Sequence, residues 1–199
     1  SEISPLGGTI IGTSRTNPYR TPEKSIPAIK ANLERYAMDA IIVVGGDDTI
    51  GVASRLYDEE KIKVVAIPKT IDNDISATDF TFGFDTAVNT AMEAIDRIRT
   101  TAESHHGVIV LEVMGRHAGW IATYAGMAGS ADVILIPELE IDIDKVCEML
   151  RQSRLRSSYH DYNVVVVAEG AVFKKGAYIT QTEKKDEFGN VMLGGIADI

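Results

Sequence analysis

The stretch GGDDT at residues 45–49, read together with PKTIDND at residues 68–74, decides the fold and points to the chemistry. Each stretch follows a short apolar run, IIVV at 41–44 and VVAI at 64–67, and such runs predict buried strands. The two stretches therefore bring glycines, four aspartates and a lysine to the ends of two strands. Crowded carboxylates repel one another and resist burial, so packing alone explains them poorly. The combination favours a site that holds a metal ion and moves a phosphoryl group.

Strands and helices alternate along the rest of the chain, and no hairpin signal separates them. Repeated βα units of this kind predict an α/β protein with parallel sheets flanked by helices. Asp85 is the expected N-cap of the longest helix. Trp120 is expected to lie in the core. The polar composition of residues 174–190 predicts loops with a hairpin or a short helix. The predicted helices span 28–36, 49–57, 85–104, 120–128 and 143–155, and the predicted strands span 40–44, 63–67, 108–113, 133–136 and 164–168.

Composition excludes several classes of function. The 199 residues carry a net charge of −9 without a basic stripe, which argues against nucleic acid as a partner. No apolar run approaches the ~20 residues that a membrane-spanning helix needs, so we expect no membrane partner. The single cysteine, Cys147, rules out an internal disulfide and fits a reducing, cytoplasmic compartment.

Position strengthens the case for a site, because ligands of open parallel sheets bind beyond the carboxyl ends of the strands. Asp47 and Asp48 follow the first predicted strand and residues 69–74 follow the second. Residues 114–117 follow the third strand and Glu169 follows the last. This agreement carries more weight than any single motif.

Each motif also has a purely structural interpretation. GGD before a helix can be a tight turn with an aspartate cap. TIDND can be a loop whose side chains bond to their own backbone. MGRHAG at residues 114–119 can be a plain connection with Arg116 on the surface. The four histidines form no zinc-ligand pattern and are expected at helix ends or in loops.

Five segments together resemble the 6-phosphofructokinase family. They lie within a match from Gly7 to Glu169, in which PKTIDND with MGR is highly specific, whereas GGDGT-like turns alone also occur in NAD kinases and diacylglycerol kinases. The resemblance implies parts of two Rossmann-like domains. Residues 1–83 would belong to the large, phosphoryl-donor domain and residues 84–199 to the small, sugar-phosphate domain. The segments are GGTIIGTSR (7–15), GGDDT (45–49), PKTIDND (68–74), TDFTFGFDTAVNTAMEAIDR (78–97) and VMGRHAGW (113–120).

The resemblance implies a glycolytic phosphotransferase that uses Mg²⁺ to phosphorylate the 1-hydroxyl of fructose 6-phosphate. Asp72 would be the base that removes the hydroxyl proton, Arg15 would touch the transferring phosphate, and Asp47 and Asp74 would hold the metal. This agrees with phosphoryl-transfer chemistry, which needs a positioned base, a metal and cations around the developing charge. The substrate-binding residues implied by the family pattern are Thr70, Asp72, Asp74, Met114, Gly115, Arg116 and Glu169.

The prediction of which phosphoryl donor is used depends chiefly on Asp48. ATP-dependent members typically have glycine there, and an aspartate adds bulk and negative charge where the α-phosphate of ATP would lie. Lys69 can neutralise pyrophosphate, although some ATP-dependent relatives also have this lysine. The pair resembles the pyrophosphate-dependent members, in which Asp48, Thr49, Lys69 and Arg15 would bind the donor. An ATP-dependent enzyme and a non-catalytic phosphosugar-binding relative remain the alternatives.

Two features depart from the family pattern. The glycine-rich donor turn should precede Gly7 and a segment that grips the sugar phosphate should follow Ile199, so we expect an internal fragment that is inactive by itself. The family commonly has an arginine that reaches across a subunit interface, and Gly107 stands at the matching position. We expect the full-length protein to be a homo-oligomer.

Overall fold

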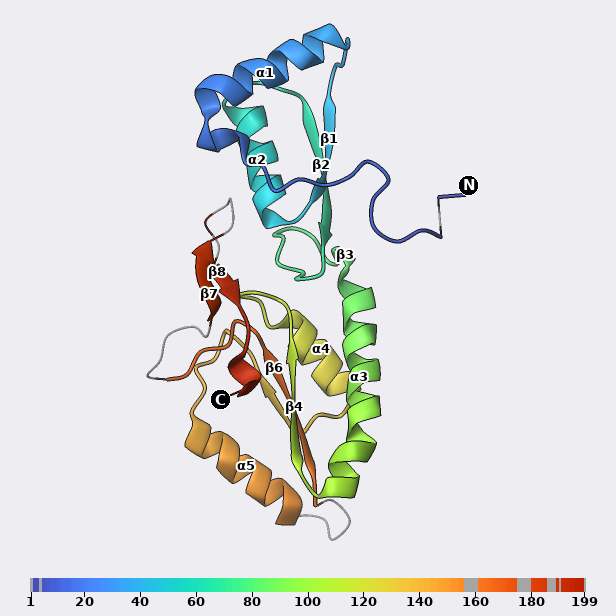
Figure 1. The fold of residues 1–199 in the computed structure, drawn as a ribbon, viewed down its shortest axis with the longest axis vertical. Helices are drawn as coiled ribbons and strands as arrows, with labels where there is room; N and C mark the ends of the chain where they lie inside the picture. Colours follow the sequence, from blue (N-terminus) through green and yellow to red (C-terminus); the bar gives the residue numbers. More distant parts are fainter. Residues whose placement is uncertain are drawn as a thin grey trace.

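The structure, a computed structural model, describes residues 2–3, 5–155, 161–174, 180–185, 189 and 191–198. Figure 1 shows two lobes, one above the other, that meet near β3 and the start of α3. Each lobe contains a parallel sheet flanked by helices, which confirms the predicted α/β fold class. No helix in the described ranges is long and apolar enough to cross a membrane.

The N-terminal lobe is built on a parallel sheet with the strand order β1-β2-β3. Helices α1 and α2 pack on the same side of it, around a small core centred on Ile26, Leu56 and Ile62. Helix α1 begins at Pro22 rather than at residue 28, because proline is well suited to the first helical position. The elements are η1 (Pro18–Arg20, a 3₁₀ turn), α1 (Pro22–Arg35), β1 (Ile41–Gly45), α2 (Asp47–Asp58), β2 (Val64–Thr70) and β3 (Phe82–Gly83).

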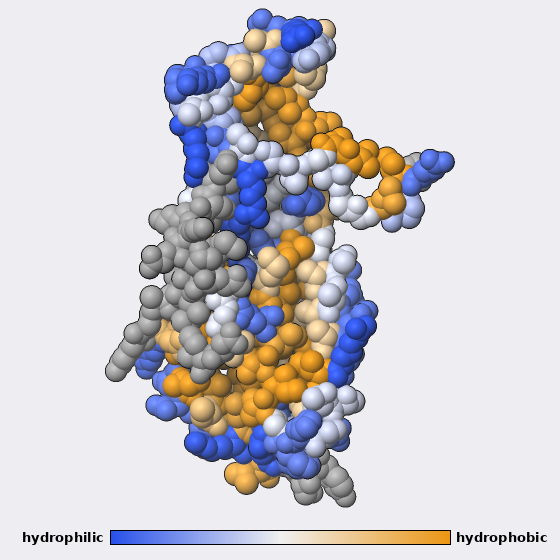
Figure 2. All heavy atoms as spheres, in the orientation of Figure 1, coloured by the Kyte–Doolittle hydropathy of each residue, from blue (hydrophilic) through white to orange (hydrophobic). Residues whose placement is uncertain are grey.

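The prediction that the first two strands are buried is wrong for one face of this sheet. Successive strand residues point to opposite faces, and Ile41 and Val64 pack against the helices. Ile42, Val44 and Val65 lie on the other face and are 67%, 51% and 60% exposed. Figure 2 shows apolar surface over this part of the upper lobe.

The C-terminal lobe has the strand order β4-β6-β5, and β6 at its centre is buried along its whole length. Helices α3 and α4 cover one face through Phe84, Ile95 and Ile121, whereas α5 covers the other face through Val146. The elements are α3 (Phe84–His105), β4 (Val108–Val113), α4 (Trp120–Ala128), β5 (Val133–Leu135), α5 (Ile143–Leu155) and β6 (Asn163–Ala168).

Two predictions in this lobe are wrong. Asp85 is not an N-cap, because Gly83 precedes α3 with φ 106° and Asp85 lies inside the first turn, where its charge suits the helix dipole. Trp120 is 45% exposed rather than buried. Its ring lies 6.1 Å from that of Tyr124 in an edge-on contact on the outer side of α4.

The polar stretch that was expected to hold loops with a hairpin or a short helix contains β7 (Thr180–Lys185), which pairs antiparallel with β8 (Val191–Leu193) just after that stretch. Residues 175–179, 186–188 and 190 of that stretch lie outside the described residues. The 3₁₀ turn η2 (Ile196–Asp198) follows, and the carboxylate of Glu112 on β4 accepts hydrogen bonds from the amides of Gly195 and Ala197. The C-terminal segment is thereby anchored to the sheet.

Candidate functional site

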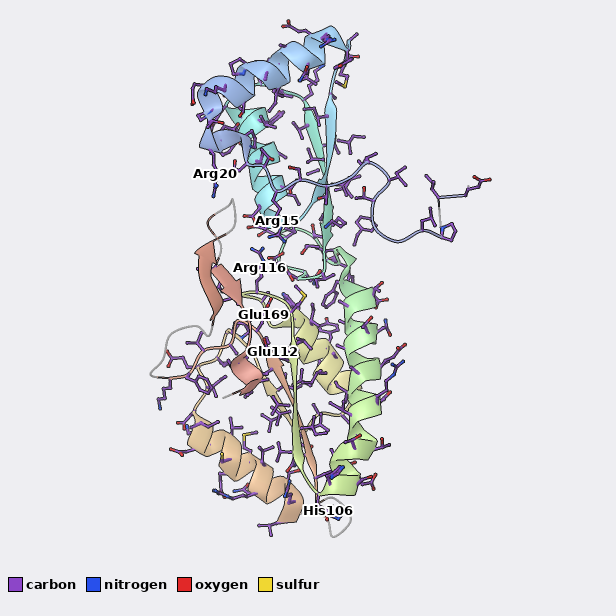
Figure 3. All side chains as sticks on the ribbon, in the orientation of Figure 1. Arg15, Arg20, His106, Glu112, Arg116 and Glu169 are labelled. Atoms are coloured by element: carbon purple, nitrogen blue, oxygen red, sulfur yellow. The ribbon has the colours of Figure 1, made fainter. Side chains whose placement is uncertain are left out.

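A cavity of about 580 Å³ lies where the two lobes meet. Its walls come from the N-terminal segment, the turns after β1 and β2, the start of α2 and the turn after β4. Figure 3 shows Arg15 and Arg116 close to this junction, with Glu169 just below. The cavity brings together most of the predicted site residues: Arg15, Asp47, Asp48, Thr49, Lys69, Thr70, Asp72, Asp74 and Arg116.

Asp47 and Asp48 follow β1 directly after Gly46. Helix α2 begins at Asp47 rather than at Thr49, so Asp47 and Asp48 both lie in its first turn, near the positive end of the helix dipole. Gly45 is required before them, because a Cβ there would come 2.5 Å from the hydroxyl of Thr49. Sequence reasoning missed the earlier start because two aspartates after two glycines resemble a loop.

The turn after β2 fixes the carboxylate of Asp72. Strand β2 continues to Thr70, beyond the predicted end at residue 67. The Thr70 hydroxyl donates to the Asp72 carboxylate at 3.2 Å and accepts from the Asp72 amide at 3.2 Å. Asn73, in the left-handed region at φ 55°, accepts from the amide of Thr81 and closes the loop. Because Gly45 and Pro68 are partners in the parallel register, the two turns lie side by side.

The environment of Asp72 suits a general base. Burial raises the pKa of Asp72, and the charge of Glu169 adds to that rise. The Thr70 hydroxyl and the charges of Arg116 and Lys69 act in the opposite direction. A base works best when its pKa approaches the working pH, so a raised carboxylate pKa favours proton abstraction.

Asp74 lies in an electronegative part of the cavity. Partial burial raises the pKa of Asp74, and the charges of Asp72 and Asp47 raise it further. Its own backbone amide and Arg116 partly offset the rise. Clustered carboxylates of this kind are stabilised by a bound cation.

Asp47 and Asp74 fit a magnesium ion shared with phosphate oxygens. The described residues contain no group of three or more histidine, cysteine, aspartate or glutamate side chains that could hold a metal by itself. Mg²⁺ is often bound by one or two carboxylates together with substrate phosphates and water. Both aspartates line the cavity, and their mutual repulsion is what such an ion would relieve.

The turn after β4 is held by the end of β6. Gly115 has φ 138° and Arg116 has φ 51°, so both adopt conformations that most residues avoid. Glu169 stabilises them, since its Oε1 accepts from the amides of Gly115 at 3.2 Å and Arg116 at 3.0 Å. Gly170 permits this approach, because a Cβ there would come 1.7 Å from the carbonyl oxygen of Arg116. The contribution of Gly170 was not predicted.

Arg116 also forms an ion pair with the opposite lobe. Its Nη1 lies 3.9 Å from Oδ2 of Asp48, and the two side chains are 40% and 34% exposed. This contact joins the turn after β4 to the first turn of α2. The sequence carries no signal for it, because it depends on how the lobes meet.

Four predicted features do not line the cavity: Met114, Gly115, Glu169 and Gly107. Met114 is 60% exposed and does not line the cavity. Gly107 precedes β4 at its amino end, about 20 Å from the turn that carries Arg116 at the usual strand rise. A side chain at position 107 therefore cannot reach the cavity of its own chain.

The sequence profile of the Phosphofructokinase family matches residues 1–196. The chain belongs to the phosphofructokinase family. It is 54% identical over 196 residues to the pyrophosphate–fructose 6-phosphate 1-phosphotransferase of Streptomyces coelicolor, covering 98% of this chain and 56% of that protein. It is 48% identical over 190 residues to the ATP-dependent 6-phosphofructokinase of Corynebacterium efficiens, covering 96% and 54%.

The solved structures agree with the family assignment. Phosphofructokinase of Pichia pastoris in the T-state superimposes with a TM-score of 0.73 at 30% identity, over 83% of this chain and 20% of that one. The resemblance seen in the sequence motifs is thereby confirmed. The chain spans about half the length of the curated relatives described above, at 56% and 54%.

Proposed function

We propose that the full-length protein is a glycolytic phosphotransferase of the cytoplasm, which transfers a phosphoryl group from pyrophosphate to the 1-hydroxyl of fructose 6-phosphate. The observation that carries this proposal is Asp48 inside the same cavity as Asp72, Lys69 and Arg15. The cavity offers a base for the sugar and cations for the donor phosphates. The carboxylate of Asp48 adds bulk and negative charge that would oppose the additional phosphate of a nucleotide.

The proposed reaction assigns each group a task. Asp72, oriented by Thr70, accepts the proton of the 1-hydroxyl while the sugar oxygen forms a bond to phosphorus. The bond from that phosphorus to the bridging oxygen breaks, and phosphate leaves. Arg15 and Lys69 line the cavity as cations for the donor oxygens. Mg²⁺, held by Asp47 and Asp74, would neutralise charge on the phosphates.

The two lobes divide the substrates in this proposal. Residues 1–83 form part of the donor domain, because the turns that carry Asp47, Asp48 and Lys69 come from the N-terminal lobe. Residues 84–199 form most of the sugar-phosphate domain, with Met114, Gly115, Arg116 and Glu169 at the substrate. Met114 is 60% exposed and does not line the cavity, so its contact with the sugar would lie at the rim.

We also propose that the full-length protein is a homo-oligomer. Trp120, Tyr124 and Met127 form an exposed apolar stripe on α4, at 45%, 39% and 62% exposure. Residues spaced in this way share one side of a helix, and such stripes are common at interfaces. Sedimentation velocity of the full-length protein tests this assignment, and a monomer at micromolar concentration would contradict it.

ATP is the alternative donor, because the relative from Corynebacterium efficiens, at 48% identity, is named as ATP-dependent. The test is steady-state kinetics of the full-length protein and its Asp48→Gly variant with each donor. We expect the unchanged protein to prefer pyrophosphate and the variant to gain some ATP turnover, with a further gain when Lys69 is also replaced. Equal use of both donors by the unchanged protein would refute the assignment of pyrophosphate.

A further inference from the structure

Arg116 is held at two points by acids from two different elements. Glu169, at the end of β6, accepts hydrogen bonds from the amides of Gly115 and Arg116 and so fixes the backbone of the turn. Asp48, in the first turn of α2, lies 3.9 Å from the guanidinium and so holds the side chain. The backbone is therefore anchored to the C-terminal lobe, while the charge is held by the N-terminal lobe.

The held guanidinium points to the donor side of the cavity. Asp48 lies in the first turn of α2 and lines the cavity together with Asp47 and Lys69. The charge of Arg116 acts on Asp72 and on Asp74 as well. A guanidinium in this place faces the space between the proposed base and the proposed donor, where negative charge develops during phosphoryl transfer.

We propose that Asp48 is a positioning residue for Arg116, in addition to its effect on the size of the donor. The role presupposes the phosphoryl transfer proposed above. The pair is half-exposed and long for an ion pair, so it is weak enough for phosphate oxygens to replace the carboxylate when the donor arrives. Asp48 thus keeps the guanidinium extended across the junction of the lobes, ready for the phosphoryl group.

Replacing Asp48 by glycine would have two effects on the reaction. Glycine at position 48 would make room for a larger donor and at the same time release Arg116 from the N-terminal lobe. A single Asp48→Gly substitution is therefore expected to lose part of its catalytic rate with pyrophosphate, whatever it gains with ATP. This loss of catalytic rate would come from the release of Arg116 and not from the larger cavity.

A double-mutant cycle in the full-length protein tests this role. Asp48→Asn keeps the size of the side chain and removes its charge. We expect it to lower kcat with pyrophosphate about two- to fivefold, the range that a partly exposed ion pair supports, with little change in the KM for fructose 6-phosphate. Asp48→Glu, which keeps the carboxylate, should retain most of kcat. In an Arg116→Gln background the same Asp48→Asn change should cause no further loss of kcat.

The controls separate positioning from general damage. Glu169→Gln weakens the hydrogen bonds to the amides of Gly115 and Arg116. Because it loosens the turn after β4, it should raise the KM for fructose 6-phosphate instead of lowering kcat. Asp58→Asn, at the far end of α2, should leave both constants unchanged. An equal loss of kcat from Asp48→Asn in both backgrounds, or no loss in either, would overturn the positioning role.

The cycle also distinguishes this inference from the proposed function. If the unchanged full-length protein turns over ATP and not pyrophosphate, the donor assignment fails, and the cycle can still be measured with ATP. If pyrophosphate is the donor and the two substitutions are additive, the donor assignment stands and the positioning role fails.

Discussion

Asp72 has the local structure of a general base, since one hydroxyl orients its carboxylate and burial raises its pKa. Asp72→Ser in the full-length protein should lower turnover by roughly 10²–10⁴-fold, the usual loss for a positioned base. Binding of fructose 6-phosphate, measured by calorimetry, should change much less. Asp79→Ser, an exposed aspartate of the same loop, is the matched control. Near-normal turnover in Asp72→Ser would remove Asp72 from this role.

The raised pKa of Asp72 also predicts a dependence of stability on pH. Its folded pKa lies above the ordinary value of 3.8, so the folded state binds the proton more tightly than the unfolded state. The charged carboxylate therefore destabilises the fold at neutral pH, and this penalty disappears as the pH falls through the folded pKa. Asp72→Asn, without ligands or Mg²⁺, should unfold at a higher temperature than the unchanged protein at pH 7.

The stability advantage of Asp72→Asn should depend on pH. Thermal unfolding at pH 7 and at successively lower pH should show the advantage of Asp72→Asn shrinking, because the unchanged protein becomes protonated there. An advantage that stays constant with pH, or a variant that is less stable at pH 7, would contradict the pKa argument.

Candidate site residues that follow neighbouring strands in the sequence could be predicted as one group before the fold was known. Asp47, Asp48, Asp72 and Asp74 follow predicted strands, and chain connectivity alone places them at one edge of a sheet. The pairing of Asp48 with Arg116 could not be predicted in the same way. It depends on the approach of two lobes, which no local pattern encodes.

The turn after β4 depends on the absence of a side chain at Gly170. A Cβ at that position would come 1.7 Å from the carbonyl oxygen of Arg116, which is backbone and cannot rotate away. Gly170→Ala should therefore destabilise the protein by about 1–3 kcal/mol, the usual cost of overpacking. It should also weaken binding of fructose 6-phosphate, because the turn must shift. Denaturant unfolding and calorimetry measure the two effects.

Gly51 in α2 provides a control of opposite sign. No atom lies within 4 Å of a Cβ built on this helical glycine. Gly51→Ala should stabilise the protein by about 0.5–1 kcal/mol through helix propensity alone. If both alanine variants had the same effect on unfolding and on binding, the account of the turn at Gly170 would be wrong.

The connection between α3 and β4 makes room for an arginine. His106, not Gly107, takes the left-handed conformation that ends α3, and a Cβ on Gly107 would meet only a carbonyl oxygen at 4.0 Å. Gly107→Arg should fold normally and should tighten fructose 6-phosphate binding in the full-length oligomer or leave it unchanged. Calorimetric titration measures this. A clear loss of affinity in a folded variant would show that Gly107 does not correspond to the interface arginine of the family.

Helices and strands with strong periodicity were predictable, and their ends were less so. The strand at Val108–Val113 and the helices at Trp120–Ala128 and Ile143–Leu155 have their predicted bounds. The start of α3 was misjudged, because Asp85 looks like a cap while Gly83 supplies the turn. Trp120 was misjudged because size and apolarity alone favour burial, whereas its position on α4 faces outward.

The whole molecule consists of two lobes with the candidate site at their junction (Figures 1 and 3). The α/β class followed from alternation along the chain. The exposed face of the N-terminal sheet did not follow, since an apolar strand has the same sequence whether one face or both faces are covered. Which donor the junction accepts is a property of the assembled site, and Asp48 is the residue on which the assignment depends.

The most direct test places both donors in one reaction. The full-length protein is supplied with fructose 6-phosphate, Mg²⁺ and equal concentrations of pyrophosphate and ATP, and phosphorus NMR follows the consumption of each donor. We predict that pyrophosphate is consumed and ATP persists while fructose 1,6-bisphosphate accumulates. Consumption of ATP at an equal or greater rate would contradict the central claim that Asp48 makes this site specific for pyrophosphate.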